Sequence, residues 1–161
     1  NRCQSQAGDV CFVEESADQF EESDSATLTA IAFSEREKFV VSSPLRPPAH
    51  VWDMETHEKR FDLVGHSGFI GFVEVSPDSQ RILTSSYFEN DGSKLWETTQ
   101  GREVLSLPGR GAKFSRNGQR IATFKAKTAF VWSAASNEEI ARWKERDREM
   151  ERQRKGLQQA N

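Results

Sequence analysis

A unit of about 40 residues recurs three times along this chain, and this repeat constrains the fold more than any other feature. Three serines that follow short apolar runs, Ser34, Ser76 and Ser115, are 42 and 39 residues apart. An apolar residue followed by tryptophan recurs downstream of each serine, with the tryptophans at positions 52, 96 and 132. Two landmarks that recur in step indicate a repeated supersecondary unit, which must stack on its neighbours to bury its apolar face.

Each unit has the pattern of antiparallel strands, because short runs rich in β-branched and aromatic residues alternate with turn-forming residues. The first unit predicts strands at 28–33, 39–43, 50–54 and 60–64. The second predicts strands at 69–75, 81–86, 94–97 and 103–107, and the third at 112–114, 120–125 and 128–133. We therefore predict that residues 27–133 are almost wholly antiparallel sheet, with no helix longer than one turn.

Composition and charge exclude several classes of protein. A chain of 161 residues, 35% apolar with a mean hydropathy of -0.72, suits one domain or a piece of a larger one. No apolar run approaches the roughly 18 residues of a membrane-spanning helix, and no signal peptide is evident, so we expect a cytoplasmic protein without membrane insertion. The net charge of -3 includes no basic stripe, which argues against a nucleic-acid partner.

The repeats resemble the blades of WD-repeat β-propellers, in which Gly-His and Trp-Asp pairs recur. Trp52-Asp53 is a Trp-Asp pair, Trp96-Glu97 is a close variant, and Gly65-His66 is the only Gly-His pair. Gly109-Arg110 stands where the next Gly-His would fall. The resemblance implies an all-β partial propeller of about three four-stranded antiparallel blades, with a short C-terminal α-helix.

This resemblance divides the chain into three segments. Residues 1–26 form an acidic segment, which is expected to be the remnant of a preceding blade with Phe12 in its tryptophan position. Residues 27–136 hold the three blades. Residues 137–161 predict a charged helix that begins at a capping box after Ser136 and fades into a frayed tail. Since closed propellers typically have 4–8 blades, we expect the remaining blades of a longer parent chain to be partners of this segment.

The family resemblance also implies a buried hydrogen-bond network in the second blade. It selects His66, Ser85 or Ser86 on the second strand, Asp91 or Asn90 on the hairpin, and Trp96. Trp52 and Trp132 are expected to be blade core, because large aromatic side chains at a structural period are normally buried. These residues are structural rather than catalytic under this interpretation.

No pattern in the sequence predicts an enzyme, a metal site or a cofactor. His50, His57 and His66 are 7 and 9 residues apart, which matches no metal-ligand motif. The sequence shows neither a nucleophile with its base nor the glycine-rich loop and partner residues of a kinase. We therefore expect a noncatalytic protein that binds no cofactor or metal.

The loops between second and third strands are the candidate binding surface for other proteins. Arg46 lies in the first such loop and Tyr87 and Phe88 lie in the second, and exposed aromatic and Arg side chains are common anchors of interfaces. The alternative is that Tyr87 and Phe88 only pack over the blade edge. We expect a protein-interaction scaffold. The second hypothesis is the sensor or regulatory region of a multidomain bacterial Ser/Thr kinase or other signalling protein, since residues 132–143 resemble the end of kinase-associated WD-repeat arrays.

Overall fold

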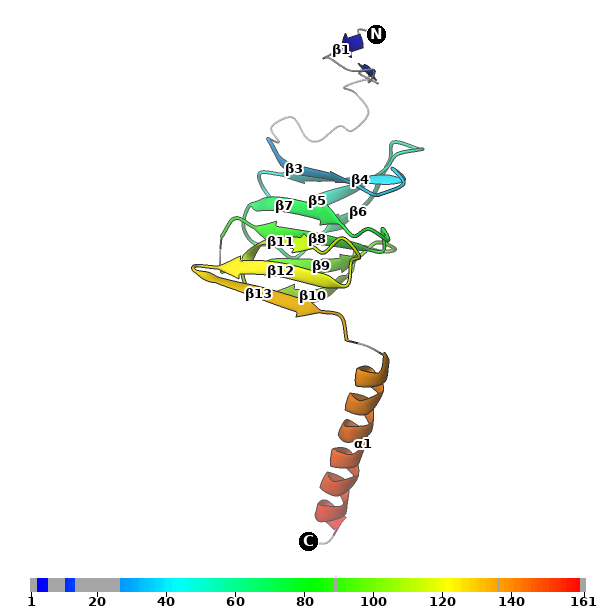
Figure 1. Cartoon of the computed structure of the whole chain (residues 1–161), viewed down its shortest axis with the longest axis vertical. Helices are drawn as coiled ribbons and strands as arrows, with labels where there is room; N and C mark the ends of the chain where they lie inside the picture. Colours follow the sequence, from blue (N-terminus) through cyan, green and yellow to red (C-terminus); the bar gives the residue numbers. More distant parts are fainter. Residues whose placement is uncertain (1–2, 6–10, 14–26, 89, 136, 160–161) are drawn as a thin grey trace. The chain divides into compact units, whose positions relative to one another are not determined.

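The computed structural model describes residues 3–5, 11–13, 27–88, 90–135 and 137–159. They form three antiparallel sheets of three or four strands, a separate two-stranded pair and one C-terminal helix (Figure 1). The chain divides into two compact units, residues 1–131 and 132–161. The predicted all-β class with repeated antiparallel blades and a C-terminal helix is confirmed.

Each sheet contains consecutive strands in sequence order. The first consists of β3 (Leu28–Phe33), β4 (Phe39–Pro44), β5 (Ala49–Asp53) and β6 (Lys59–Leu63). The second consists of β7 (Ile70–Val75), β8 (Arg81–Ser86), β9 (Ser93–Glu97) and β10 (Glu103–Leu107). The third has three strands among the described residues, β11 (Arg110–Phe114), β12 (Arg120–Lys125) and β13 (Thr128–Ser133). All predicted strands are therefore present, with their ends within two residues of the prediction.

The acidic N-terminal segment is described only at two short strands. β1 (Cys3–Ser5) pairs antiparallel with β2 (Cys11–Val13), and Gln4 lies opposite Phe12. The assignment of Phe12 to the tryptophan position of a preceding blade stays a prediction.

The repeated serines close the turn between the first two strands of every sheet. Ser34 Oγ accepts a hydrogen bond from the amide of Phe39 at 3.1 Å, and Ser76 Oγ accepts from the amide of Arg81 at 2.9 Å. The third copy repeats this geometry, with Ser115 and Arg120 at 3.0 Å. Because the hydroxyl satisfies an amide at the start of the next strand, the serine recurs at the same place in each unit.

The acid that follows each of the first two tryptophans organises the next turn. Asp53 Oδ1 accepts from the amides of Glu55 at 2.8 Å and Thr56 at 3.0 Å. Glu97 has the same role in the second blade, where its carboxylate accepts from the amide of Gln100 at 3.0 Å. The hydrogen bonds from the Thr56 amide and the Arg60 side chain lower the pKa of Asp53 to about 2. The Trp-acid pair thus joins a buried strand end to a turn held by a carboxylate.

The main hydrophobic core lies between the first and second sheets. The first strands of neighbouring sheets are adjacent, β3 beside β7 and β7 beside β11 (Figure 1). The core includes Val41, Leu63, Ile70, Ile82 and Trp96, each at most 1% exposed. Stacking of blade on blade therefore buries the apolar faces that a single four-stranded sheet would leave in water.

The C-terminal helix α1 (Asn137–Gln159) is continuous over 23 residues, so the prediction that it fades into a frayed tail was wrong. Its sequence contains no Gly or Pro before Gly156, and Glu145 forms an exposed ion pair with Arg148 at 3.4 Å. Such i,i+3 pairs and straight-chain residues favour helix. Ser136, the predicted N-cap, lies outside the described residues. None of the described helical residues form a segment long and apolar enough to cross a membrane.

The burial of Trp96 gives the first testable prediction. Trp96 is 1% exposed whereas Trp132 is half-buried, so Trp96→Ala should lower the free energy of unfolding by about 3–5 kcal/mol. Trp132→Ala should cost less. Urea unfolding of both variants measures the difference. A loss below about 1 kcal/mol for Trp96→Ala, the ordinary effect of a point substitution, would contradict the assigned core position.

Candidate functional site

A buried polar chain runs through the second sheet and ends at the β8–β9 loop. Trp96 Nε1 donates to Thr84 Oγ1 at 2.8 Å, and Thr84 Oγ1 lies 2.8 Å from His66 Nε2. His66 Nδ1 lies 2.8 Å from Asp91 Oδ2. We call these four residues, Trp96, Thr84, His66 and Asp91, the polar chain of the second blade.

The partners fix the protonation of the chain. A carboxylate only accepts, so His66 Nδ1 carries the proton that it donates to Asp91. Burial lowers the pKa of His66 below its usual range and outweighs the opposing effect of Asp91, so the imidazole is neutral near pH 7. Its Nε2 therefore accepts from the Thr84 hydroxyl, which in turn accepts from Trp96. Every polar atom of this chain inside the sheet has a partner.

Thr84, and not Ser85 or Ser86, is the second-strand member of this chain, so the sequence prediction was wrong at that position. Adjacent strand residues point to opposite faces. Ser85 faces the third sheet, where its Oγ lies 2.7 Å from Ser93 Oγ and accepts from the amide of Ala112 at 3.0 Å. The repeat held the signal that was missed: Ser42, Thr84 and Thr123 each follow a turn serine by eight residues.

The same position carries a hydroxyl in the other two sheets. Trp52 Nε1 donates to Ser42 Oγ at 2.8 Å in the first sheet, and Trp52 is 8% exposed. In the third sheet Thr123 Oγ1 donates to the carbonyl of Pro108 at 2.8 Å. The tryptophan–hydroxyl contact is thus present in the first two blades, and in the second it extends to His66 and Asp91.

Asp91 holds the β8–β9 loop in place from inside. Burial alone would raise the pKa of Asp91, but hydrogen bonds from His66 and from the amides of Ser67 and Gly68 lower it below its usual range. Both amides lie 3.2 Å from the carboxylate. The carboxylate therefore ties its own loop to the β6–β7 loop beside it. This loop also carries Tyr87 and Phe88.

Five side chains make a continuous aromatic and cationic cluster at this edge, which we call the loop-edge patch. Phe69 packs on Phe88 with ring centroids 5.6 Å apart, and Phe88 meets Tyr87 edge-to-face at 6.3 Å. Arg110 Cζ lies 5.8 Å from the centroid of Tyr87 and 5.5 Å from that of Phe124. Tyr87 is 61% exposed, Phe88 51%, Phe124 40% and Phe69 38%. The rings thus pack against one another and still present a large apolar surface.

Two of the three predicted loop residues join the patch and one does not. Arg46 is exposed on the β4–β5 loop, and no hydrogen bond, ion pair or ring contact among the described residues links it to the patch. Arg110 was missed by the sequence analysis, although Gly109-Arg110 was recognised as the counterpart of Gly65-His66. The sequence held no signal for this placement, because Arg110 joins the patch through the rings of Tyr87 and Phe124, which lie far from it in the sequence.

The contact between His50 and Asp62 joins two strands of the first sheet. His50 Nδ1 lies 2.7 Å from Asp62 Oδ1 across β5 and β6. Among the described residues no group of three or more His, Cys, Asp and Glu side chains is placed to hold a metal ion.

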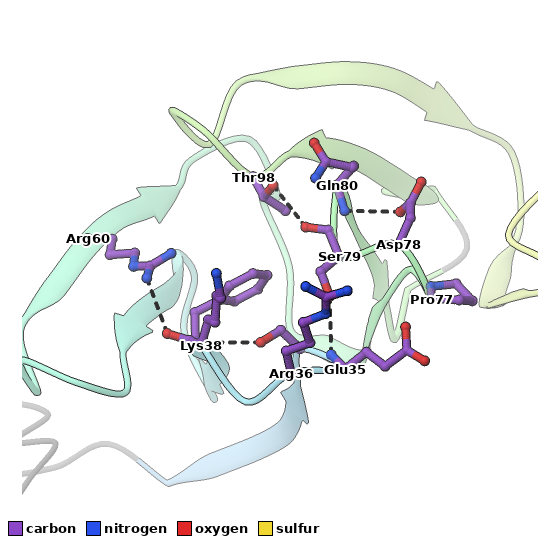
Figure 2. Close-up of a pocket in the computed structure, with 11 residues that line it drawn as sticks. Glu35, Arg36, Lys38, Arg60, Pro77, Asp78, Ser79, Gln80 and Thr98 are labelled. Carbon is purple, nitrogen blue, oxygen red and sulfur yellow. Dashed lines mark hydrogen bonds between the residues drawn. The ribbon is translucent and has the colours of Figure 1, made fainter.

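A polar pocket of about 460 Å³ lies at the opposite edge, between the β3–β4 and β7–β8 turns (Figure 2). Ser79 Oγ accepts from the amide of Glu35 at 3.1 Å, and Thr98 Oγ1 donates to the carbonyl of Ser79 at 3.1 Å. Arg60 on its rim is already bound to Asp53 and to the carbonyl of Lys38. These polar groups form hydrogen bonds with one another across the turns, so the lining of the pocket joins two blades. The residues that line it include no nucleophile–base pair.

The stacked antiparallel blades with their tryptophan–hydroxyl contacts support a WD-repeat β-propeller class of protein. No family model matches the sequence. The chain is 25% identical over 111 residues to small ribosomal subunit protein RACK1 of Caenorhabditis elegans, covering 66% of this chain and 34% of RACK1. It is 29% identical over 68 residues to MST50-interacting protein 11 of Pyricularia oryzae and to RACK1 of Neurospora crassa. Each of these two matches covers 42% of this chain and 21% of the relative.

RACK1 is a WD-repeat β-propeller protein, so this weak homology supports the WD-repeat family for the present chain. The chain spans about a third or less of the length of the curated relatives it matches.

The polar chain predicts a specific cost for removing one hydroxyl. Thr84→Val keeps the shape but leaves the indole N–H and the imidazole nitrogen without a partner, and unfolding free energy should fall by about 1–3 kcal/mol for each orphaned group. Thr84→Ser, which retains the hydroxyl, is the control and should cost less. Equal losses for the two variants in urea unfolding would show that the hydroxyl contributes nothing.

The pKa shift of His66 predicts acid sensitivity. Because the folded-state pKa lies below the ordinary value of 6.5, the unfolded state takes up a proton first as the pH falls. The contribution of His66 to stability is therefore constant above about pH 7 and declines as the pH falls through 6.5 toward the folded-state pKa. Unfolding free energies should be measured from about pH 7.5 to about pH 5, the range over which histidine titrates. They should fall more steeply for the wild type than for His66→Gln. Parallel curves would contradict a neutral, buried His66.

Proposed function

We propose that this chain is a noncatalytic WD-repeat propeller segment that acts as a protein–protein interaction scaffold, with the loop-edge patch as its contact surface. The observation that carries the proposal is that Tyr87 and Phe88 remain more than half exposed although their loop is anchored by Asp91. Exposed Tyr and Arg side chains on an ordered loop are typical anchors of protein interfaces, because little side-chain freedom is lost on binding.

Similarity to RACK1 and to a protein named for its interaction with MST50 supports a scaffold over an enzyme. The partners, the cytoplasmic location and the additional blades of a longer parent chain belong to the same proposal. Residues 1–26 would then be the remnant of a preceding blade.

A second proposal rests on the stretch from Trp132 to Trp143 alone, which resembles the end of kinase-associated WD-repeat arrays. In this case the segment would be the regulatory region of a bacterial signalling protein such as a Ser/Thr kinase. Determining the coding sequence upstream of Asn1 distinguishes the two proposals, since only the second requires a catalytic domain in the same chain.

The scaffold proposal predicts that the double substitution Tyr87→Ala, Phe88→Ala reduces partner binding, because truncated anchors typically cost about 2 kcal/mol or more. Affinity capture from cells with quantitative mass spectrometry measures the loss for each recovered protein. Val104→Ala is the matched control, since Val104 is 56% exposed on the outer strand β10, away from the loops. Undiminished capture by a folded double variant would place the binding surface elsewhere.

A further inference from the structure

Arg110 begins β11, the first strand of the third sheet, whereas His66 lies in the loop before β7. Gly109-Arg110 follows Gly65-His66 by 44 residues, but Arg110 precedes its turn serine by five residues and His66 precedes its own by ten. In the second blade the β8–β9 loop supplies Asp91 to His66. In the third blade the β12–β13 turn consists of Ala126 and Lys127, which contain no carboxylate. The third sheet thus presents a cationic side chain to which this turn supplies no acid.

The guanidinium is held firmly but its hydrogen-bonding capacity is largely unused. It lies between the rings of Tyr87 and Phe124, and Nη1 donates to the carbonyl of Tyr87 at 3.2 Å. Nε is buried without a hydrogen-bond partner. Among the described residues no carboxylate lies within 4.0 Å of Arg110. Four of the five N–H donors of an Arg side chain thus have no acceptor in the described segments of the chain.

The surroundings of Arg110 define what would bind there. The guanidinium is half-buried, and the exposed rings of Tyr87, Phe88 and Phe124 surround it with apolar surface. Arg pairs bidentately with planar carboxylates, and partial removal from water strengthens such a charge-assisted hydrogen bond. A single guanidinium balances the single charge of a carboxylate, whereas a phosphate dianion would call for further cations.

We infer that Arg110 is the residue of the loop-edge patch that binds an acidic side chain of a partner. The partner is a peptide segment presenting Asp or Glu beside an apolar or aromatic residue. This inference rests on the proposed protein-binding function and names the chemistry of the partner. The acid binds the free Nη groups of Arg110, and the apolar residue covers Tyr87 and Phe88. Arg110 thereby supplies specificity, and the rings supply buried area.

The probe is a phage-displayed library of random peptides selected on the intact chain. Enriched peptides and their acid-to-amide counterparts, Asp→Asn or Glu→Gln, are then measured by fluorescence anisotropy against the wild type and Arg110→Gln. We expect enriched peptides to carry an acid next to an apolar residue. Neutralising either the acid or Arg110 should weaken binding about tenfold or more. The two changes together should cost little beyond one alone, because they remove the same contact.

Arg116→Gln is the matched control, since Arg116 is exposed on the β11–β12 turn at the opposite edge. Its affinities should stay within about twofold of the wild type, as is usual for surface substitutions outside a contact. If Arg110→Gln does not fold, the amide peptides on the wild type and the variant Arg110→Lys still test the inference.

The inference is overturned if no peptide is enriched, if enriched peptides lack an acid, or if Arg116→Gln weakens binding as much as Arg110→Gln. Tighter binding of phosphoserine counterparts than of the acidic peptides would overturn the choice of a carboxylate. Peptides that need Tyr87 but not Arg110 would contradict this inference and leave the proposed function standing. Binding indifferent to Tyr87, Phe88 and Arg110 would contradict both.

Discussion

The second blade depends on the hydroxyl of Thr84, because this group accepts a hydrogen bond from Trp96 and donates one to His66. This contact orients the indole against the core and keeps the imidazole in the tautomer that donates to Asp91. Gly65 belongs to the same arrangement, since a Cβ there would lie 2.9 Å from the indole of Trp96. A buried polar chain of this kind stabilises only when each member is satisfied, which makes the blade sensitive to loss of any one.

The chain also links stability to the surface proposed for binding. Asp91 accepts from His66 inside the sheet and from Ser67 and Gly68 at the neighbouring loop. Asp91, three residues after Phe88, is therefore held against the sheet and the β6–β7 loop by contacts within the chain itself. In the third sheet Arg110, at the start of β11, contacts the rings of Tyr87 and Phe124 in the patch. The second and third sheets therefore both contribute side chains to this surface.

The strands were predictable because the repeat records local requirements: Ser34, Ser76 and Ser115 each close a turn through a nearby amide. Thr84 was not, because three hydroxyl residues follow one another in β8 and only the strand register decides which faces Trp96. Arg110 could not be placed from sequence, since its position depends on rings contributed by the β8–β9 loop and by β12. The continuity of α1 was not predicted, although its straight-chain charged residues have a high helix propensity.

The second blade depends on a neutral His66 that joins Thr84 to Asp91. Nitrogen-15 NMR of histidine-labelled protein at pH 7 reads the state of each ring nitrogen directly. We predict one neutral tautomer for His66, with the proton on Nδ1 and with Nε2 as a hydrogen-bond acceptor. A proton on Nε2, a doubly protonated ring, or the averaged signal of a freely exchanging imidazole would contradict it.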